Sequence, residues 1–316
     1  VHTLLDTLAD PEKGVIKDFR EIDVIGHRLV HGGEKFTGSV VITDEVTQAM
    51  TECNDLAPLH NPANLVGVEA CRKLMPDTLM VGVFDTAFNQ TMEPKAFLCG
   101  LPYRYYERHR IRRYGFHGIS HKYVSRRAAE FMGQDPGRVK TIVCHLGNGA
   151  SICAVKYGQV VDNSMGFTPL EGLVMGTRCG DVDPGALEFL AKKENLDFAQ
   201  VLDILNQESG VLGISKNFSS DFRELKDAEI KYNDQAALAR EIFAYRVAKY
   251  VGSYAAAMNG VDNIVFTAGV GENDSDIRME ICSYLEYLGI TIDEVKNRDE
   301  AEAFRISDGM SRVNVL

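Results

Sequence analysis

Residues 141–154, T-I-V-C-H-L-G-N-G-A-S-I-C-A, constrain the fold of this chain more than any other stretch. Two apolar runs flank a Gly-Asn-Gly turn, and Asn-Gly between β-forming residues is the strongest short-range hairpin signal. The stretch therefore predicts two antiparallel strands joined by a very tight turn. Its polar members, His145 and Asn148, and its small members, Gly147 and Gly149, lie where a ligand can approach the backbone.

Exposed amides in such a turn favour binding of a phosphate group. Taken alone, the stretch is better explained as an ordinary hairpin that carries a satisfied core histidine. Other parts of the chain are needed to decide between these interpretations.

Size and composition narrow the possible classes. A chain of 316 residues exceeds the size at which one hydrophobic core usually stops growing, so two domains are expected. The net charge of −11 argues against a general nucleic-acid or anionic-membrane partner. No run approaches the roughly 20 apolar residues of a membrane span, and the first residues lack a signal-peptide pattern. Seven cysteines without C-x-x-C spacing favour a reducing compartment, the cytoplasm.

Hydrophobic periodicity predicts an alternation of strands and helices, which is typical of α/β layers. Strands are expected over 21–31, 78–84, 141–154, 158–162 and 263–268, and a last strand begins near 311. Helices are expected over 43–56, 61–74, 121–132, 184–193, 197–207, 234–258 and 275–288. Pro94, Gly100 and Pro102 suggest a domain boundary between 88 and 102, and we divide the chain into 1–90 and 91–316.

Two segments do not fit plain secondary structure. Residues 103–113 are dense in arginine and tyrosine, which favours a salt-bridged surface or subunit contact over RNA binding in so acidic a chain. Residues 164–185 carry five glycines without low complexity, and a loop so long is usually functional. Cys179 in that loop resembles a nucleophile beside Arg178, but a small buried residue is the better interpretation.

Glycine-containing turns follow or join apolar strands near Gly32, Gly147, Gly176 and Gly269. None has the G-x-x-x-x-G-K-[ST] pattern of a P-loop, and Gly269-x-Gly271 lacks the third glycine of a dinucleotide fingerprint. Several phosphate-sized turns with nearby arginines indicate a phosphoryl-transfer enzyme of another kind.

Six blocks of the chain, in order, resemble the acetate kinase (acetokinase) family of carboxylate kinases. They are G-H-R-L-V-H-G-G-E-K-F (26–36), V-F-D-T-A-F (83–88), R-R-Y-G-F-H-G-I-S-H (112–121), H-L-G-N-G-A-S (145–151), S-M-G-F-T-P-L-E-G-L-V-M-G-T-R-C-G-D-V-D-P (164–184) and G-V-G-E-N (269–273). The resemblance implies an α/β two-domain fold of the actin, hexokinase and sugar-kinase type (ribonuclease H-like), with the nucleotide in the inter-domain cleft. It also implies reversible phosphoryl transfer from ATP to acetate with Mg²⁺ or Mn²⁺, in a cytoplasmic homodimer.

The same resemblance implies roles for four residues. Arg28 and Arg178 match arginines that hold acetate and stabilise the transferring group, although a structural ion pair is the commoner fate of a loop arginine. His117 matches the transition-state histidine, although a histidine after an aromatic residue is more often simply packed. Asp85 matches a residue described as a proton donor or acceptor, and because acetate is already ionised we favour a magnesium or water ligand.

Binding residues are implied in the same way. The acetate methyl group would contact Val30, Leu59, Phe116 and Pro169, with Arg28 at the carboxylate. The nucleotide would contact His145, Leu146, Gly147, Asn148, Gly149, Asp221, Phe222, Arg223, Gly269, Val270, Gly271, Glu272 and Asn273. Locally, Asp221 to Arg223 could equally be a helix cap with an exposed arginine, and Gly269-Val-Gly a strand-to-helix turn without a ligand.

Some alternatives stay open. By the resemblance, 1–90 is the remainder of an acetate- and metal-side domain, and 91–316 the nucleotide-binding and dimerisation domain. The family's N-terminal strands and phosphate loop and its C-terminal segment are missing from these residues, so a non-catalytic nucleotide-binding fragment is one alternative. Propionate kinase is another, because one methylene is worth only about 1–3 kcal/mol in such a pocket. A dinucleotide oxidoreductase lacks its fingerprint.

Overall fold

The computed structural model describes residues 7–57, 60–298 and 304–316. The contacts divide the chain into two compact units, Val1–Gln90 and Thr91–Leu316. Each unit is described by itself below. The assignment of acetate and metal to one unit, and of nucleotide and dimer contacts to the other, stays a prediction.

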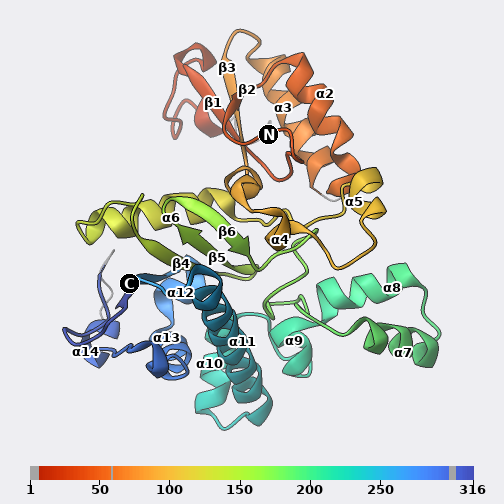
Figure 1. The fold of residues 1–316 in the computed structure, drawn as a ribbon. Helices are drawn as coiled ribbons and strands as arrows, with labels where there is room; N and C mark the ends of the chain where they lie inside the picture. The colour runs from red at the N-terminus through yellow and green to blue at the C-terminus, as the bar shows by residue number, and fades with distance from the viewer. Residues whose placement is uncertain (1–6, 58–59, 299–303) are drawn as a thin grey trace. The chain divides into compact units, whose positions relative to one another are not determined.

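The first unit contains a three-stranded sheet in the order β1-β3-β2 (Figure 1). Strands β1 (Val24–Leu29) and β3 (Leu79–Phe84) are parallel, and β2 (Val40–Val41) is antiparallel to β3. The other elements are η1 (Phe19–Glu21), α2 (Asp44–Glu52), η2 (Asn54–Leu56), α3 (Asn61–Leu74) and η3 (Ala87–Thr91), the last of which runs across the boundary between the units.

The parallel pairing of β1 and β3 brings their carboxyl ends to the same edge of the sheet. Arg28 lies opposite Val83 in register, and the backbone N–H of Asp85 donates to Leu29 O at 2.8 Å, just past the end of β3. Beneath this edge the rings of Phe36 and Phe84 stack with centroids 4.4 Å apart. The edge therefore presents Arg28 and Asp85 above a buried apolar core.

The second unit is built on a five-stranded sheet in the order β6-β5-β4-β7-β8. The hairpin of β4 and β5 is antiparallel, and β4 runs parallel to β7. The strands are β4 (Lys140–Leu146), β5 (Ala150–Lys156), β6 (Gln159–Asn163), β7 (Asn263–Thr267) and β8 (Asn314–Val315). The predicted hairpin is confirmed, with 147–149 as its three-residue turn.

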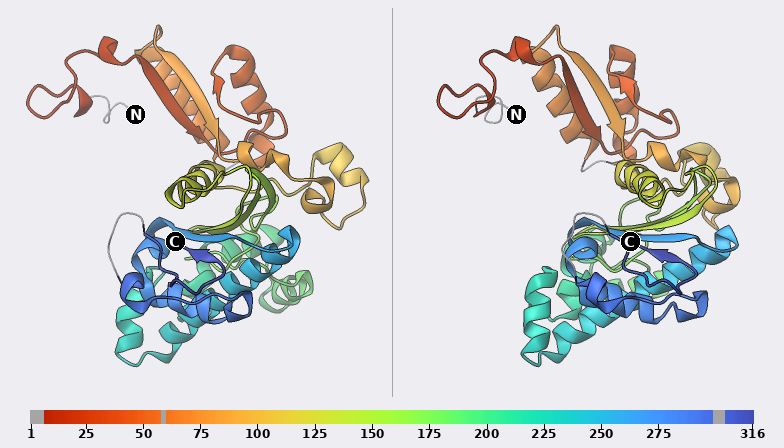
Figure 2. Two further views of the ribbon diagram at one scale, coloured as in Figure 1. Left: turned by 60° about the vertical axis from the view of Figure 1, so that its left-hand side comes forward. Right: turned by 90° about the vertical axis from the view of Figure 1, so that its left-hand side faces the viewer.

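Helices cover both faces of this sheet (Figure 2), with α6 on one face and α11 on the other. Both strands of the hairpin are almost entirely buried between them, which explains their unbroken apolar runs. The helices of the unit are α4 (Pro94–Phe97), α5 (Arg104–His109), α6 (Gly118–Phe131), α7 (Pro184–Glu194), α8 (Phe198–Asp203), η4 (Ile204–Glu208), α9 (Gly210–Ile214), α10 (Phe222–Ile230), α11 (Asp234–Met258), α12 (Ala268–Asn273), α13 (Ser275–Ser283), η5 (Glu286–Leu288) and α14 (Glu294–Asn297).

The structure corrects several predicted boundaries. The helix expected over 43–56 ends at Glu52, and the one expected over 275–288 ends at Ser283. The helix expected over 197–207 changes from α-helix to π-helix at Ile204. The predicted glycine turn after β7 is wrong, because 268–273 form helix α12. Glu272 stabilises its start by accepting from the backbone N–H of Ala268 at 2.9 Å.

In the part of the chain that the structure describes, no helix is both long and apolar enough to cross a membrane.

Candidate active site

The turn of the β4–β5 hairpin lies at the carboxyl edge of two parallel strands. His145 near the end of β4 pairs in register with Thr267 at the end of β7, so both strands deliver loops to one place. A Cβ on Gly147 would lie 3.7 Å from the Cβ of Ala268, the first residue of α12. In open α/β sheets, ligands bind outside the carboxyl ends of the strands. The hairpin turn and the start of α12 therefore form one candidate binding edge.

The glycine-rich loop 164–184 folds back onto this turn. The backbone N–H of Gly176 donates to Asn148 O at 2.9 Å, and a Cβ at Gly176 would overlap Asn148 Oδ1. Hydrogen bonds from Val211 and Leu212 to the carbonyls of Met175 and Gly176 anchor the loop from its other side. These contacts hold the next segment of the loop, which contains Arg178, against the hairpin.

The Arg178 guanidinium has no ion-pair partner among the described residues. Its Nη1 donates to the carbonyl oxygen of Pro169 at 3.2 Å and lies 3.8 Å from Met175 Sδ. Burial lowers the pKa of Arg178 below the usual arginine value. A half-buried cation that lacks a carboxylate is favourable where an anionic ligand supplies the missing charge. The structural ion pair considered from sequence is therefore wrong for Arg178.

Gly149 brings Arg178 and His117 together. A Cβ built on Gly149 would lie 3.3 Å from Arg178 Nη1 and 3.8 Å from both Cε1 and Nε2 of His117. The predicted transition-state histidine and one predicted arginine thus face the same glycine of the hairpin turn. An anion seated on this turn would meet both a guanidinium and an imidazole edge.

Three histidines are clustered behind the turn. His117 precedes α6 in a left-handed conformation with φ of 55°, and its ring lies 4.2 Å from that of His145, centroid to centroid. Ser120 Oγ lies 2.8 Å from His145 Nδ1. Ser151 Oγ lies 2.8 Å from both His117 Nδ1 and His121 Nε2. His121, Ser120 and Ser151 were not predicted as site residues, although His121 closes the F-H-G-I-S-H motif.

In the first unit, the structure pairs Arg28 with Asp85. Arg28 Nη2 and Nε donate to Asp85 Oδ2 at 2.6 and 3.2 Å. The Asp85 side chain is 4% exposed and that of Arg28 is 66% exposed. The hydrogen bond to Asp85 raises the pKa of Arg28. Here the structural ion pair does occur, but it joins two of the predicted functional residues to each other.

Asp85 also bears on the predicted metal. Its Oδ1 accepts no hydrogen bond among the described residues, so one oxygen of a nearly buried carboxylate stays available. No cluster of three or more histidine, cysteine or acidic side chains that could hold a metal occurs in 7–57, 60–298 and 304–316. Mg²⁺ commonly takes one or two protein carboxylates and completes its shell with water and substrate phosphates. Asp85 fits a single ligand of that kind.

The predicted acetate-methyl residues are divided between the two units. Val30 is half-buried, and its N–H donates to Asn64 Oδ1 at 3.0 Å. In the second unit Phe116 is buried, and the carbonyl oxygen of Pro169 is the one that accepts from Arg178. Leu59 lies outside the described residues.

The segment Asp221 to Arg223 forms a helix cap. Asp221 is the N-cap of α10 and accepts from the backbone N–H of Arg223 at 2.8 Å. Arg223 Nη2 also forms an ion pair with Asp221 Oδ2 at 2.5 Å, and this hydrogen bond lowers the pKa of Asp221 to about 2. The Arg223 side chain is 90% exposed. The local structure is therefore the cap with an exposed arginine that the sequence offered as an alternative.

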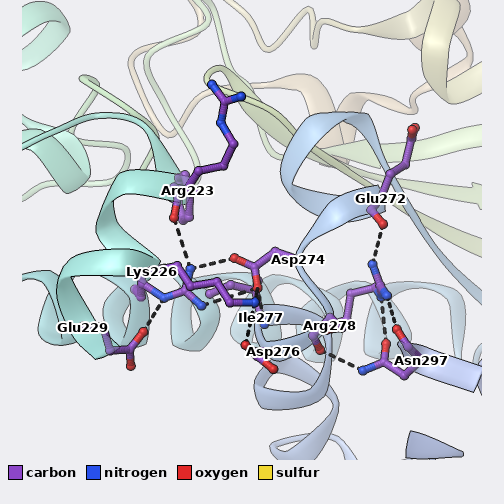
Figure 3. Close-up of polar contacts among 12 residues, drawn as sticks. Arg223, Lys226, Glu229, Glu272, Asp274, Asp276, Ile277, Arg278 and Asn297 are labelled. Carbon is purple, nitrogen blue, oxygen red and sulfur yellow. Dashed lines mark hydrogen bonds and ion pairs between the residues drawn. The ribbon is translucent and has the colours of Figure 1, made fainter. Parts of the chain in front are cut away.

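A network of charged side chains joins this cap to the segment after α12 (Figure 3). Arg240, nearly buried on α11, donates to Asp274 Oδ2 at 2.6 Å and to Glu229 Oε2 at 2.6 Å. Its Nη1 also lies 3.5 Å from the carbonyl oxygen of Phe222. One guanidinium thus connects the predicted nucleotide segment 221–223 to Asp274, the residue that follows the predicted segment 269–273.

A second buried arginine, Arg278, holds α12 directly. Its Nη1 donates to the carbonyl oxygens of Gly271 at 3.0 Å and Glu272 at 2.7 Å, and its Nε donates to Asn297 Oδ1 at 2.8 Å (Figure 3). These carbonyls lie at the last turn of a helix, where they have no intrahelical partner. Sequence reasoning missed Arg240 and Arg278. The acidic partners of Arg240 lie 11 and 34 positions away in the chain, and Arg278 bonds to backbone carbonyls, which no side-chain pattern marks.

The basic-aromatic segment 103–113 is folded onto itself. The Arg112 guanidinium lies 3.7 Å from the centre of the Phe97 ring, and Arg104 and Arg110 stack on neighbouring tyrosines. Arg113 donates to the carbonyl oxygens of 163–165 and forms an ion pair with Glu171. The segment therefore braces the start of loop 164–184. Burial raises the pKa of the Cys179 thiol, as expected for a packed residue rather than a nucleophile.

Comparisons with known proteins identify the family of this chain. The family model described as "Acetokinase family" matches residues 1–316. The chain belongs to the acetokinase family. An acetate kinase of Agathobacter rectalis is 61% identical over 297 residues, which cover 94% of this chain and 75% of that protein. One from Lachnoclostridium phytofermentans is 57% identical over 316 residues, covering 100% and 80%.

Solved structures of the acetokinase family show the same fold, the actin-like two-domain fold predicted for this chain. The crystal structure of Porphyromonas gingivalis acetate kinase matches with a TM-score of 0.96 and 52% identity, over 99% of this chain and 79% of that one. A propionate kinase from Francisella tularensis matches with a TM-score of 0.92 and 42% identity, over 100% and 79%.

Proposed function

We propose that this chain transfers a phosphoryl group reversibly between ATP and acetate, giving acetyl phosphate and ADP. Family membership carries the reaction class, and the acetate kinases among its relatives, at 56–61% identity, favour acetate. The propionate kinase that resembles it is 42% identical, so propionate is the second candidate acceptor.

The observation that carries the chemistry is the position of Arg178. It is half-buried, has no carboxylate partner among the described residues, and faces the Gly149 turn together with His117. In-line phosphoryl transfer depends mainly on positioning and on stabilising charge at the equatorial oxygens. We assign Arg178 and His117 to that task, with the guanidinium and an imidazole N–H as donors to the transferring group.

Acetate is ionised at neutral pH, so its attacking oxygen needs no general base. It needs a cation that holds the carboxylate, and the exposed guanidinium of Arg28 suits that role because its planar fork matches two carboxylate oxygens. The bond of Arg28 to Asp85 engages Nη2 and Nε and fixes the plane of the fork. We assign Val30, Phe116 and Pro169 to the methyl group.

Asp85 would hold the Mg²⁺ or Mn²⁺ ion through Oδ1. When bound, such an ion neutralises phosphate charge and fixes the geometry of the phosphate oxygens. Asp85 itself does not move a proton in this scheme, because the carboxylate nucleophile carries none. Its ion pair with Arg28 places the carboxylate that would hold the metal next to the guanidinium that would hold acetate.

For the nucleotide, we assign the phosphates to 145–149 and the adenosine side to 221–223 and 269–273. Support comes from the packing of Gly147 against α12 and from the two arginines that fix these segments. We further propose, from the resemblance alone, a cytoplasmic homodimer whose second unit carries the dimer contacts.

The direct test is a hydroxamate assay for acetyl phosphate with and without ATP. We expect product only with ATP and Mg²⁺, and a loss of kcat of about 100-fold or more in Arg178→Ala, as for removal of one transition-state donor. Arg138→Ala, which removes an exposed arginine of the same unit, is the matched control. ATP binding without acetyl phosphate would instead support a nucleotide-binding protein, and a faster reaction with propionate would favour a propionate kinase.

A further inference from the structure

The hydroxyl of Ser151 contacts two histidine rings of the cluster. Its Oγ lies 2.8 Å from Nδ1 of His117 on one side and 2.8 Å from Nε2 of His121 on the other. Ser151 and His121 are both fully buried, while His117 is only partly covered. The three side chains thus form a hydrogen-bonded chain that runs from the core toward the Gly149 turn.

The number of protons in this chain is limited. A serine hydroxyl donates one hydrogen bond, and a neutral imidazole carries one N–H. Complete burial lowers the pKa of His121 well below its ordinary value, and the neighbouring rings of His117 and His145 lower it further, so His121 is neutral. Two directions of donation are then possible through Ser151, from His121 to His117 or the reverse.

The far nitrogen of His121 decides between these directions. Its Nδ1 is buried and has no hydrogen-bond partner in the described part of the chain. If His117 donated to Ser151, and Ser151 to His121 Nε2, the proton of His121 would lie on Nδ1 as a buried N–H without an acceptor. Buried N–H groups without an acceptor are rare in native proteins, and such a group costs about 1–3 kcal/mol.

The opposite direction avoids this cost. His121 Nε2–H donates to Ser151 Oγ, and Ser151 Oγ–H donates to His117 Nδ1. Only a bare ring nitrogen then stays unpaired at His121 Nδ1. In a third arrangement both histidines would donate to Ser151 Oγ. The buried hydroxyl proton of Ser151 would then have no acceptor, which carries a similar cost.

We infer that Ser151 and His121 are positioning residues that hold His117 in the tautomer protonated at Nε2. Its Nδ1 is occupied by the serine proton, so the N–H lies on the ring edge that faces Gly149, beside Arg178 Nη1. The inference rests on the proposed function, because that N–H is the donor assigned to the transferring phosphoryl group. It gives a role to the serine of H-L-G-N-G-A-S and to the second histidine of F-H-G-I-S-H.

The decisive measurement is the protonation state of the His117 ring in the full chain labelled with ¹⁵N-histidine. Long-range ¹H–¹⁵N correlation spectra distinguish the protonated ring nitrogen from the bare one, and loss of one spin system in His117→Asn assigns the signal. We expect the wild type to show His117 protonated at Nε2 and bare at Nδ1. A proton on Nδ1 of His117 in the active wild type would overturn the inference.

Kinetics of Ser151→Ala give a second readout. We expect kcat to fall about 10- to 100-fold, because the donor loses its fixed orientation, with KM for ATP and acetate changed less than about threefold. His121→Gln keeps an N–H donor toward Ser151 and should retain most of the activity. Ser125→Ala is the matched control, because it removes a buried hydroxyl of α6 that bonds only to its own helix.

The proposed function and the inference fail in different ways. Full activity of His117→Asn would show that His117 is not the donor, whatever its tautomer. An inactive His117→Asn together with unchanged kcat and an unchanged His117 spectrum in Ser151→Ala would overturn the inference alone.

Discussion

The Arg28 guanidinium donates two hydrogen bonds to one oxygen of Asp85, at 2.6 Å from Nη2 and 3.2 Å from Nε, while the other carboxylate oxygen accepts none from the residues that the structure describes. A purely structural ion pair between these groups would favour the bidentate arrangement, with one donor to each oxygen. The one-sided pairing instead leaves an anionic oxygen beside a cation at the carboxyl edge of β1 and β3. This arrangement supports the proposal that Asp85 holds a metal ion beside an arginine that binds acetate.

Asp85→Asn should lower kcat by about 100-fold and raise the Mg²⁺ concentration needed for half-maximal rate. The amide removes the charge that would hold the ion and weakens the tie to Arg28. The hydroxamate assay across a magnesium titration measures both. Asp77→Asn, in the exposed turn before β3, is the control; unchanged activity and magnesium requirement in Asp85→Asn would exclude the assigned role.

Val30→Ala should narrow the preference for acetate over propionate. The wild type is expected to have the higher kcat/KM for acetate, and a pocket enlarged at Val30 accommodates the extra methylene, which is worth about 1–3 kcal/mol. The ratio of kcat/KM for the two acids is the measurement, and Val66→Ala on the exposed face of α3 serves as control. An unaltered ratio would remove Val30 from the pocket.

Gly149→Ala should impair catalysis without unfolding the protein. The backbone of Gly149 is not in the left-handed region, so alanine is allowed there, but its Cβ would lie 3.3 Å from Arg178 Nη1. We expect kcat to fall at least about tenfold, since small displacements of positioned groups are costly, while Tm changes little. Gly100→Ala, where a Cβ meets nothing within 4 Å, should leave both unchanged; equal effects of the two variants would contradict the prediction.

His31 should make the first unit sensitive to mild acid. Burial lowers its pKa from 6.5 to about 4, and its Nδ1 accepts from the backbone N–H of Gly33 at 3.0 Å, which a protonated ring cannot do. The unfolded chain takes up the proton near pH 6.5 and the folded chain only near 4, so stability is lost as the pH falls between these values. The loss is on the order of 3 kcal/mol by linkage.

Urea unfolding at several pH values measures this loss. His31→Asn, which has no titrating ring, should flatten the pH dependence between about pH 6.5 and about pH 4. An equally steep dependence in the variant would assign the acid sensitivity to other groups.

Arg240→Met should destabilise the second unit by about 3 kcal/mol, because it leaves the nearly buried carboxylate of Asp274 without the guanidinium that neutralises its charge. Adding Asp274→Asn to this variant should recover part of the lost free energy of unfolding, as measured by urea unfolding. Since Arg240 also approaches Phe222 O, KM for ATP should rise more than KM for acetate. Lys226→Met, which removes a more exposed partner of Asp274, should cost no more than about 1 kcal/mol.

Local sequence patterns predicted the elements that depend on neighbours in the chain. The Gly-Asn-Gly hairpin and the helix Asp234–Met258 were predicted nearly residue for residue, because turn chemistry and apolar periodicity act over short distances. The helix over 268–273 was not predicted, because the glycines in this segment favour a turn. Its helix depends on Glu272 bonding back to Ala268 and on Arg278 holding its last carbonyls.

The sequence by itself determined the family of this chain and the identity of its candidate site residues, because these are written in contiguous blocks such as 112–121 and 164–184. Only the tertiary structure decided how the candidates are paired. Arg28 has a carboxylate partner, whereas Arg178 has none among the described residues. Ser151 joins His117 to His121 although it lies 34 and 30 positions from them in the sequence. The physical reason is that charge pairing and proton direction depend on groups brought together through the sheet and its loops, which no local pattern encodes.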